Sequence, residues 1–159
     1  DMYRFGMVMD MPYQMDHTTF YGRGPIENYS DRKASQLVGV YNNTADNMFF
    51  PYIRPQETGT FSDLRYWKQT DTEGNGLKVT ANELFSASAL HYNIADLDDG
   101  EAKEQRHSYQ VPKSRYTVLC VDGEQYGVGG QDSWGVWPFE QYRIHFGKKA
   151  FTFTLSPLK

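Results

Sequence analysis

The sequence lacks most of the residues and patterns that identify catalytic or metal-binding proteins. One cysteine among 159 residues excludes an internal disulfide and a cysteine zinc cluster. No HExxH, GxSxG or P-loop motif is present. Metal-ligand spacing is also missing among the four histidines, which are His17, His91, His107 and His145. Local motifs therefore indicate no catalytic residue and no metal site in this chain.

Positive charge and long hydrophobic runs are missing too. There are 16 Lys and Arg residues against 20 Asp and Glu, and the net charge of −4 excludes the basic surface that nucleic-acid-binding proteins carry. No apolar run approaches the roughly 18 residues of a membrane-spanning helix. We therefore expect no nucleic-acid partner and no membrane partner.

The sequence is rich in aromatic residues, which make up 16% of it and lie in β-strand patterns. Its length is that of a single domain, residues 1–159. Apolar side chains alternate with a period of two and helical periodicity is scarce, so we expect an all-β fold. Short helical turns are expected at Ile94–Leu97 and Gly100–Gln105. The predicted strands are Tyr3–Met9, 35–41, Phe61–Gln69, a hairpin at Asp71–Ala81, Leu84–His91, Tyr116–Val121, and a C-terminal hairpin of Tyr142–Phe146 and Ala150–Leu155.

Two other features have structural interpretations. Cys120 lies in the apolar stretch TVLCV, which predicts a buried thiol. Residues Asp71–Gly76 resemble the start of a calcium-binding loop, but Asn82 occupies the twelfth position, where such a loop needs a bidentate Glu. A hairpin turn is the better interpretation, because Asn75-Gly76 suits the positive φ of tight hairpins.

The stretch YGVGGQDSWG, Tyr126–Gly135, is the strongest candidate for a binding loop. Three glycines in four residues allow backbone conformations that other residues reach only with strain, and Trp134 follows them. Such a loop can present the flat indole to a sugar ring, whose axial C–H groups form an apolar patch. The alternative is a tight turn that buries Trp134 in the core, where large aromatic residues are usually found.

Two more segments combine Gly or Pro with Arg, Glu, Asn and aromatic residues. They are FYGRGPIENYSDRK, Phe20–Lys33, and FFPYIRPQETGTFSDLRYW, Phe49–Trp67. Each is predicted to be a rigid irregular segment whose polar side chains brace one another. The structural interpretation of the first segment is that salt bridges pin it, formed among Arg23, Glu27, Asp31 and Arg32.

Together these three segments resemble the C-terminal domain (the small-chain or fifth-domain type) of the lactase-type bacterial β-galactosidases of glycoside hydrolase family 2. The family motif YGRGPxENYxDR stands here as YGRGPIENYSDR, Tyr21–Arg32. The motif PYxxPQExGxxxDxRW is similar to Pro51–Trp67, with one residue inserted before the Trp. The motif GVGGxxSWG is Gly127–Gly135. The order and rough spacing of the motifs also agree.

The resemblance implies a β-sandwich of the supersandwich, galactose mutarotase-like type. It begins near the middle of the family domain, so it implies a truncated, C-terminal portion of that domain. In the family a TIM-barrel domain carries both catalytic glutamates, and the Mg and Na ions are bound by other domains. We therefore expect a non-catalytic part of a retaining β-galactosidase that has no cofactor of its own and is inactive when isolated.

Motif position implies one functional residue, Trp134, which would stack on the substrate at the aglycone side of the active site. Gly129, Gly130, Asp132 and Ser133 would support its loop. The expected partners are a β-galactoside saccharide, the TIM-barrel catalytic domain and further copies of the enzyme in a homo-oligomer. A bacterial cytoplasm or periplasm fits the family, and the sequence itself names no compartment.

The chain departs from the family at two places, which leaves the preferred β-galactoside open between lactose and others. Gln131 stands where the family commonly has an acidic residue. Thr58-Gly59-Thr60-Phe61 replaces Asn-Gly-Asn-Arg, and the lost Arg predicts a gap in a charge network. Trp137 adds a second aromatic platform after the loop.

Two other functions stay open at this point. A free-standing carbohydrate-binding module would use the same Trp, and glycan binding by the isolated chain would distinguish it. An aldose-epimerase-like enzyme shares the fold class but needs a His with a Glu as base and acid, and the histidines match no such motif.

Overall fold

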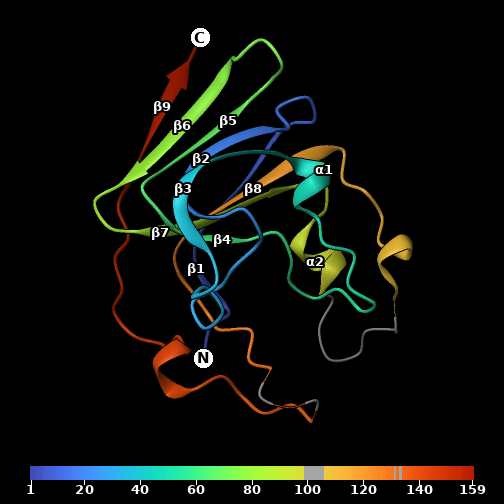
Figure 1. The fold of residues 1–159 in the computed structure, drawn as a ribbon, viewed down its shortest axis with the longest axis vertical. Coiled ribbons are helices and arrows are strands. Elements are labelled where there is room, and N and C mark those ends of the chain that lie inside the picture. Colours follow the sequence, from blue (N-terminus) through green and yellow to red (C-terminus); the bar gives the residue numbers. More distant parts are fainter. Residues whose placement is uncertain (99–105, 131, 133) are drawn as a thin grey trace.

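The computed structural model of the chain describes residues 1–98, 106–130, 132 and 134–159, which form two antiparallel sheets (Figure 1). The four-stranded sheet has the order β1-β8-β7-β4, with bounds β1 Arg4–Pro12, β8 Tyr116–Gln125, β7 Phe85–Leu90 and β4 Phe61–Leu64. The five-stranded sheet has the order β3-β2-β5-β6-β9, with bounds β3 Leu37–Thr44, β2 His17–Gly24, β5 Tyr66–Thr70, β6 Gly76–Ala81 and β9 Phe153–Leu158.

In the described residues, helical structure is limited to short pieces. These are α1 Ala45–Met48, α2 Ile94–Leu97, and single 3-10 turns at Ser108–Gln110 and Glu140–Tyr142. None of the helices in the described part of the chain is long and apolar enough to span a membrane. The expected all-β sandwich is confirmed.

The core lies between the two sheets and is rich in aromatic rings. Phe20 from β2, Phe61 from β4 and Trp67 from β5 are each at most 1% exposed. The ring centroid of Phe20 lies 4.5 Å from that of Phe61 and 5.5 Å from that of Trp67. Burying a Phe-sized side chain contributes about 1.5–3 kcal/mol, so these rings stabilise the contact between the sheets.

Many of the predicted elements are present. In β1, Met7 and Met9 pack against the core while Val8 and Asp10 are exposed, as a period-two pattern requires. The turn at Gly100–Gln105 lies outside the described residues. The strands predicted around 35–41, Leu84–His91 and Tyr116–Val121 are β3, β7 and β8, and the helical turn predicted at Ile94–Leu97 is α2.

The two structural interpretations made from the sequence are confirmed. Cys120 is a free thiol, 2% exposed, and burial raises its pKa to about 11. Residues 71–75 form the turn of a hairpin between β5 and β6, and Asp71 Oδ1 accepts hydrogen bonds from the backbone N–H groups of Glu73 and Asn75, both at 2.9 Å. The positive φ of this turn falls on Gly74, at 88°, and not on Asn75.

The single strand predicted over Phe61–Gln69 is wrong, because the segment forms two strands in different sheets. β4 belongs to the four-stranded sheet and β5 to the five-stranded sheet. Leu64 and Trp67 are both fully buried although they are three residues apart, a spacing that one flat strand cannot place on one face. The chain bends between them at Arg65, where β4 ends and β5 begins.

The C-terminal hairpin is also wrong. Residues 142–146 form no strand beyond an isolated bridge between Ile144 and Met2, and β9 pairs with β6 instead. The side chains of Arg143 and His145 alternate as in a strand, but both contact the carboxylate of Asp1. The alternation of side chains here reflects their contacts with the Asp1 side-chain carboxylate and not a sheet ladder.

Strand β2 was missing from the prediction, because its residues read as the start of the irregular segment Phe20–Lys33. It lies inside the five-stranded sheet, between β3 and β5. A Cβ at Gly22 would lie 2.5 Å from Leu64 Cδ2. The glycine in YGRG therefore lets the two sheets approach closely and does not mark a loop.

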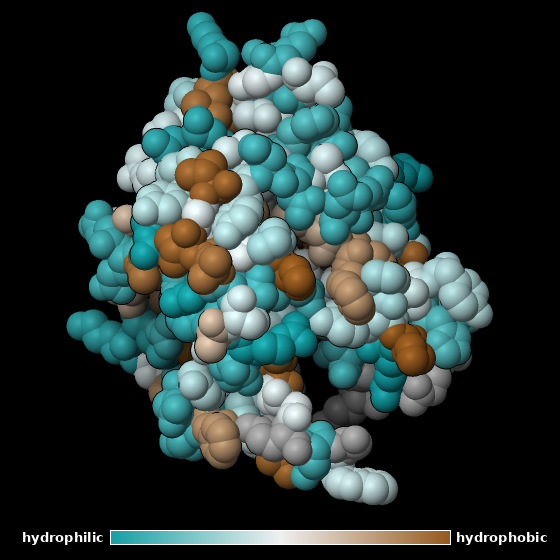
Figure 2. All heavy atoms as spheres, in the orientation of Figure 1, coloured by the Kyte–Doolittle hydropathy of each residue, from teal (hydrophilic) through white to brown (hydrophobic). Residues whose placement is uncertain are grey.

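Strand β3 is an edge of the five-stranded sheet and exposes Leu37, Val38 and Val40. Figure 2 shows a small group of hydrophobic residues over this strand on a mostly hydrophilic face. After β8, residues 126–130 and 134–152 run below the N-terminus and return upward to β9 (Figure 1).

Candidate functional site

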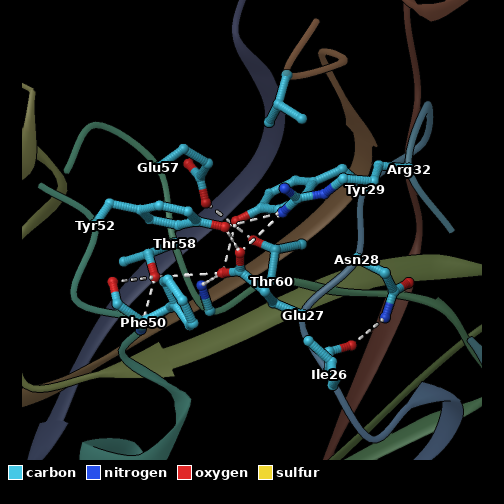
Figure 3. Close-up of polar contacts among 12 residues, drawn as sticks. Ile26, Glu27, Asn28, Tyr29, Arg32, Phe50, Tyr52, Glu57, Thr58 and Thr60 are labelled. Carbon is cyan, nitrogen blue, oxygen red and sulfur yellow. Dashed lines mark hydrogen bonds and ion pairs between the residues drawn. The ribbon is translucent and has the colours of Figure 1, made fainter. Parts of the chain in front are cut away.

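A buried carboxylate, that of Glu27, organises the segment after β2 (Figure 3). Its Oε1 accepts hydrogen bonds from Arg32 Nη2 at 2.8 Å and from the Tyr52 hydroxyl. Its Oε2 accepts from the backbone N–H of Gly59 at 2.6 Å and from the Thr58 hydroxyl at 3.3 Å. This carboxylate therefore joins the first two motif segments. We call the group the Glu27 hub: Glu27, Tyr29, Arg32, Tyr52, Thr58 and Gly59.

Tyr29 completes the hub from the inside. It is 1% exposed, and its hydroxyl donates to Glu27 Oε2 at 3.3 Å. The guanidinium of Arg32 lies over its ring, 5.2 Å from the centroid. Burial, with the nearby carboxylates of Glu57 and Glu27, raises the pKa of Tyr29 well above its usual value. The phenol therefore remains a protonated donor, as a structural hydrogen bond needs.

A second buried charge group lies beside the hub. Arg4 Nη2 on β1 is 3.0 Å from Asp122 Oδ2 on β8, and Arg4 Nη1 is 3.8 Å from Glu57 Oε2. Asp122 is 1% exposed, and burial raises its pKa to about 6 despite the opposing charge of Arg4. Burial also raises the pKa of Glu57. We call these three residues the Arg4 cluster; the cation occupies the space between its two carboxylates.

The glycine loop is tied to the first motif segment by Asp31. Oδ1 accepts the backbone N–H of Val128 at 3.1 Å, and Oδ2 accepts that of Gly129 at 2.8 Å. The N–H of Gly127 donates to the carbonyl of Tyr142 at 2.8 Å. A Cβ at Gly127 would lie 2.6 Å from Asp31 Oδ2, so this approach requires glycine. The loop thus begins from a fixed position.

Trp134 projects from this loop into solvent and is 91% exposed, so the alternative of a core Trp is wrong. Its backbone N–H donates to Asp132 Oδ1 at 2.7 Å. Gly129 and Gly130 have φ values of 71° and 99°, a region that favours glycine. The indole is therefore presented by backbone shape and not by packing. Two further positions of the loop lie outside the described residues: Gln131 and Ser133.

Trp137, three residues on, is held quite differently. The Cζ of Arg143 lies over its ring, 5.2 Å from the centroid, and Tyr126 meets it edge-on at 6.4 Å. Arg143 is itself fixed by Asp1, with Nη2 2.6 Å from Oδ2. Trp137 nevertheless remains 61% exposed. We call Trp137, Tyr126 and Arg143 the Trp137 platform.

Arg143 also lines a polar hollow of about 230 Å³. Its lining includes the ion pair between Lys33 Nζ and Asp63 Oδ1, which are 2.7 Å apart. Polar side chains dominate the wall, among them Ser30, Gln125 and Gln141. Phe85 and Tyr142 also line this hollow but are buried or half-buried, whereas the well-exposed Trp134 and Trp137 lie on the loop and its continuation.

The salt bridges predicted within Phe20–Lys33 form in part. Arg32 pairs with Glu27 as expected. Arg23 pairs outside the segment, with Nε 2.5 Å from Asp63 Oδ2. Asp31 accepts backbone N–H groups of the glycine loop. The segment is thus braced as predicted, but two of its four charged residues reach across to other segments.

The stretch Thr58–Phe61, which departs from the family motif, is packed and hydrogen-bonded. Phe61, at the position of the family Arg, is 1% exposed and packs in the aromatic core. Thr58 and Gly59 both donate to Glu27. Core packing and the hub occupy this stretch, and the gap in a charge network stays a prediction.

Sequence reasoning missed Arg4, Asp122 and Arg143. Arg4 and Asp122 are 118 positions apart, so their pairing has no local signal. A weak signal exists in the composition of their strands, since each is a lone charge at the end of an apolar stretch, RFGMVM and VLCVD. Among the described residues, no three His, Cys, Asp or Glu side chains gather as a metal site would require; the expectation that this chain holds no cofactor stays a prediction.

Comparison with known proteins gives one consistent answer. The family model described as the β-galactosidase small chain matches residues 1–156. A β-galactosidase of Priestia megaterium is 34% identical over 154 residues, which cover 96% of this chain and 14% of that protein. The β-galactosidase BgaC of Bifidobacterium adolescentis is 37% identical over 143 residues, which cover 88% and 13%.

A β-galactosidase of Streptococcus thermophilus is 31% identical over 156 residues, 97% of this chain and 15% of that protein. The chain therefore spans about one seventh of the length of these curated relatives. What it shares with them is one part of a much larger polypeptide.

Proposed function

This chain belongs to the β-galactosidase small chain family, and on that premise we propose that it is a non-catalytic part of a retaining β-galactosidase whose Trp134 contacts the aglycone sugar of the substrate. The observation that carries the proposal is the 91% exposure of Trp134 on a loop that Asp31 anchors. An indole that is so exposed loses little packing when it binds a ligand.

The arrangement of carboxylates supports a non-catalytic role. A retaining glycosidase needs two carboxyl groups about 5–5.5 Å apart, with the scissile bond between them. In the described part of the chain, Glu57 and Asp122 share Arg4, while Asp1 and Glu140 share Arg143. In each pair a guanidinium takes the place that a substrate would need. The TIM-barrel domain of the same enzyme would supply the nucleophile and the acid.

Stacking on Trp134 would act on binding and orientation. A β-galactoside placed with its galactose in the catalytic domain would extend its aglycone toward this chain, where a flat ring face can meet the indole. Such positioning lowers the entropy cost of reaching the reactive geometry. Lactose and other β-galactosides with a sugar aglycone are the proposed substrates, and the enzyme would act as a homo-oligomer.

The test is Trp134→Ala in the complete enzyme that contains this chain. We expect kcat/KM for lactose to fall roughly 3- to 10-fold, the range that one aromatic stacking contact supplies. Trp134→Phe keeps a flat ring and should retain most of the activity. Unfolding stability should change by less than about 0.5 kcal/mol, because the side chain is exposed.

Unchanged kinetics of Trp134→Ala, with both lactose and an aryl galactoside, would contradict the proposal. Saccharide binding by this chain alone, measured by calorimetry with lactose, would favour the carbohydrate-binding module instead.

A further inference from the structure

We propose that the Trp137 platform binds a second sugar ring of the aglycone, so that the site selects β-galactosides whose aglycone is itself an oligosaccharide. This inference rests on the proposed function of Trp134 and extends it. Trp137 is three residues from Trp134, and three residues of extended chain span at most about 10–11 Å. The spacing between two neighbouring rings of one saccharide is on the same scale as this distance.

Preorganisation is the first argument. Arg143 over the ring and Tyr126 at its edge fix the plane of Trp137 before any ligand arrives. Asp1 holds Arg143 in turn, through Nε at 2.8 Å and Nη2 at 2.6 Å. A side chain already held in place loses little entropy on binding, so more of the contact energy appears as affinity. Trp134 has no comparable side-chain support in the described structure.

Exposure is the second argument. A Trp that only completed a core would be mostly buried, as Trp67 is at 0%. Trp137 keeps 61% of its surface in solvent although two side chains contact it. More than half of this residue's surface is therefore accessible, on a side chain that two neighbours hold in place.

The polar surroundings point to a saccharide and not to a protein surface. His145 Nδ1 lies 2.8 Å from Asp1 Oδ1, and His145 Nε2 lies 2.6 Å from Glu140 Oε1. Arg143 Nη1 lies 2.9 Å from Glu140 Oε2. Planar polar groups around an aromatic face suit a ring that carries both C–H and hydroxyl groups. Cores of protein interfaces, by contrast, are depleted of charged side chains.

The experiment compares two substrates in the complete enzyme: lactose, with one aglycone ring, and a β-galactosyl-lactose trisaccharide, with two. Trp137→Ala should raise KM for the trisaccharide roughly 3- to 10-fold and leave KM for lactose unchanged. Trp137→Phe should restore most of the loss, because it keeps a flat ring. Phe139→Ala is the matched control: this residue is also aromatic and 62% exposed, lacks the Arg143 contact, and should leave both KM values unchanged.

The outcomes separate this inference from the proposed function. If Trp134→Ala raises KM for both substrates and Trp137→Ala raises KM for neither, the platform inference is wrong and the proposed function stands. If Trp134→Ala changes neither substrate, the proposed function is wrong. If Trp137→Ala raises KM equally for both substrates, the platform has a structural role and the inference is wrong. If Trp137→Ala changes subunit assembly, measured by light scattering, the platform is a protein contact and the inference is also wrong. Unchanged lactose kinetics show that the variant is folded.

Discussion

The Glu27 hub and the Trp134 loop both consist of dense family motifs, yet they use them in opposite ways. In the hub, Glu27 is 8% exposed, and its carboxylate accepts hydrogen bonds from several donors at once. In the loop, the indole of Trp134 is 91% exposed, and its residue is held through its backbone N–H by Asp132. The hub gathers polar groups inward, whereas the loop sends an apolar group outward.

This difference indicates where each motif acts. A fully bonded carboxylate contributes to stability and has no free lone pair for a ligand, because its partners already occupy both oxygens. An exposed aromatic side chain contributes little to stability and is free to bind. We therefore expect substitutions in the hub to change folding and substitutions in the loop to change binding.

The largest expected effect tests the hub itself. Glu27→Ala should destabilise the chain by about 3–5 kcal/mol, because two buried donors, the Gly59 N–H and the Tyr29 hydroxyl, would lose their acceptor and the half-exposed Arg32 would lose its partner. Urea unfolding monitored by circular dichroism measures the change. Glu73→Ala, which removes an exposed carboxylate in the β5–β6 hairpin, is the control and should change stability by less than about 0.5 kcal/mol. If the two variants had equal urea midpoints of unfolding, Glu27 would contribute no more to stability than an exposed surface carboxylate, and the prediction would be wrong.

The next effect concerns pH and the Arg4 cluster beside the hub. Burial raises the pKa of Asp122 from 3.8 to about 6, so the folded state holds this proton more tightly than the unfolded state does. The stability that this group contributes is present in full below about pH 4 and is lost as the pH rises through about 6. The difference between the two pKa values corresponds to about 2–3 kcal/mol.

Asp122→Asn removes this titration and should therefore gain stability relative to the unmodified chain between pH 4 and pH 7. Urea unfolding at four pH values across that range measures the gain. Parallel pH profiles for the two proteins would show that Asp122 does not titrate there. Trp134 carries no titratable group itself, so Trp134→Ala should follow the profile of the unmodified chain.

The smallest effect concerns Asp31, which connects the two regions. Asp31→Asn keeps the shape of the side chain but loses one of its two charged acceptor oxygens for the N–H groups of Val128 and Gly129. We expect a loss of about 1 kcal/mol in stability, since a charge-assisted bond is replaced by a neutral one. Lactose KM in the complete enzyme should also rise. A change in stability alone would mean that the loop keeps its position without this carboxylate.

The strands were predictable where one face is core and the other solvent, as in β1, whose Met7 and Met9 alternate with exposed residues. The prediction failed where tertiary contacts override the pattern. Leu64 and Trp67 are both buried because the chain changes sheets between them. Arg143 and His145 alternate because both reach Asp1, 142 and 144 positions away.

The site was predictable through its motifs and not through its electrostatics. The glycine spacing and Trp134 are visible in the sequence, and so are the charged residues of Phe20–Lys33. The bond from Asp31 to Gly129 spans 98 positions, and the fixation of Trp137 depends on Arg143 and Asp1. Partners so far apart in sequence leave no local pattern, so only the fold reveals them.

The anchoring of the loop also has a kinetic meaning. The N–H of Tyr126 donates to the carbonyl of Tyr3, and Asp31 and Asp1 hold the segments that follow. All these contacts close very long stretches of chain, which is slow and entropically costly. We therefore expect the loop to become ordered late in folding, after the aromatic core. An intermediate with a complete sandwich and an unformed loop would resemble the native protein in circular dichroism and yet lack the loop on which the proposed sugar contact depends.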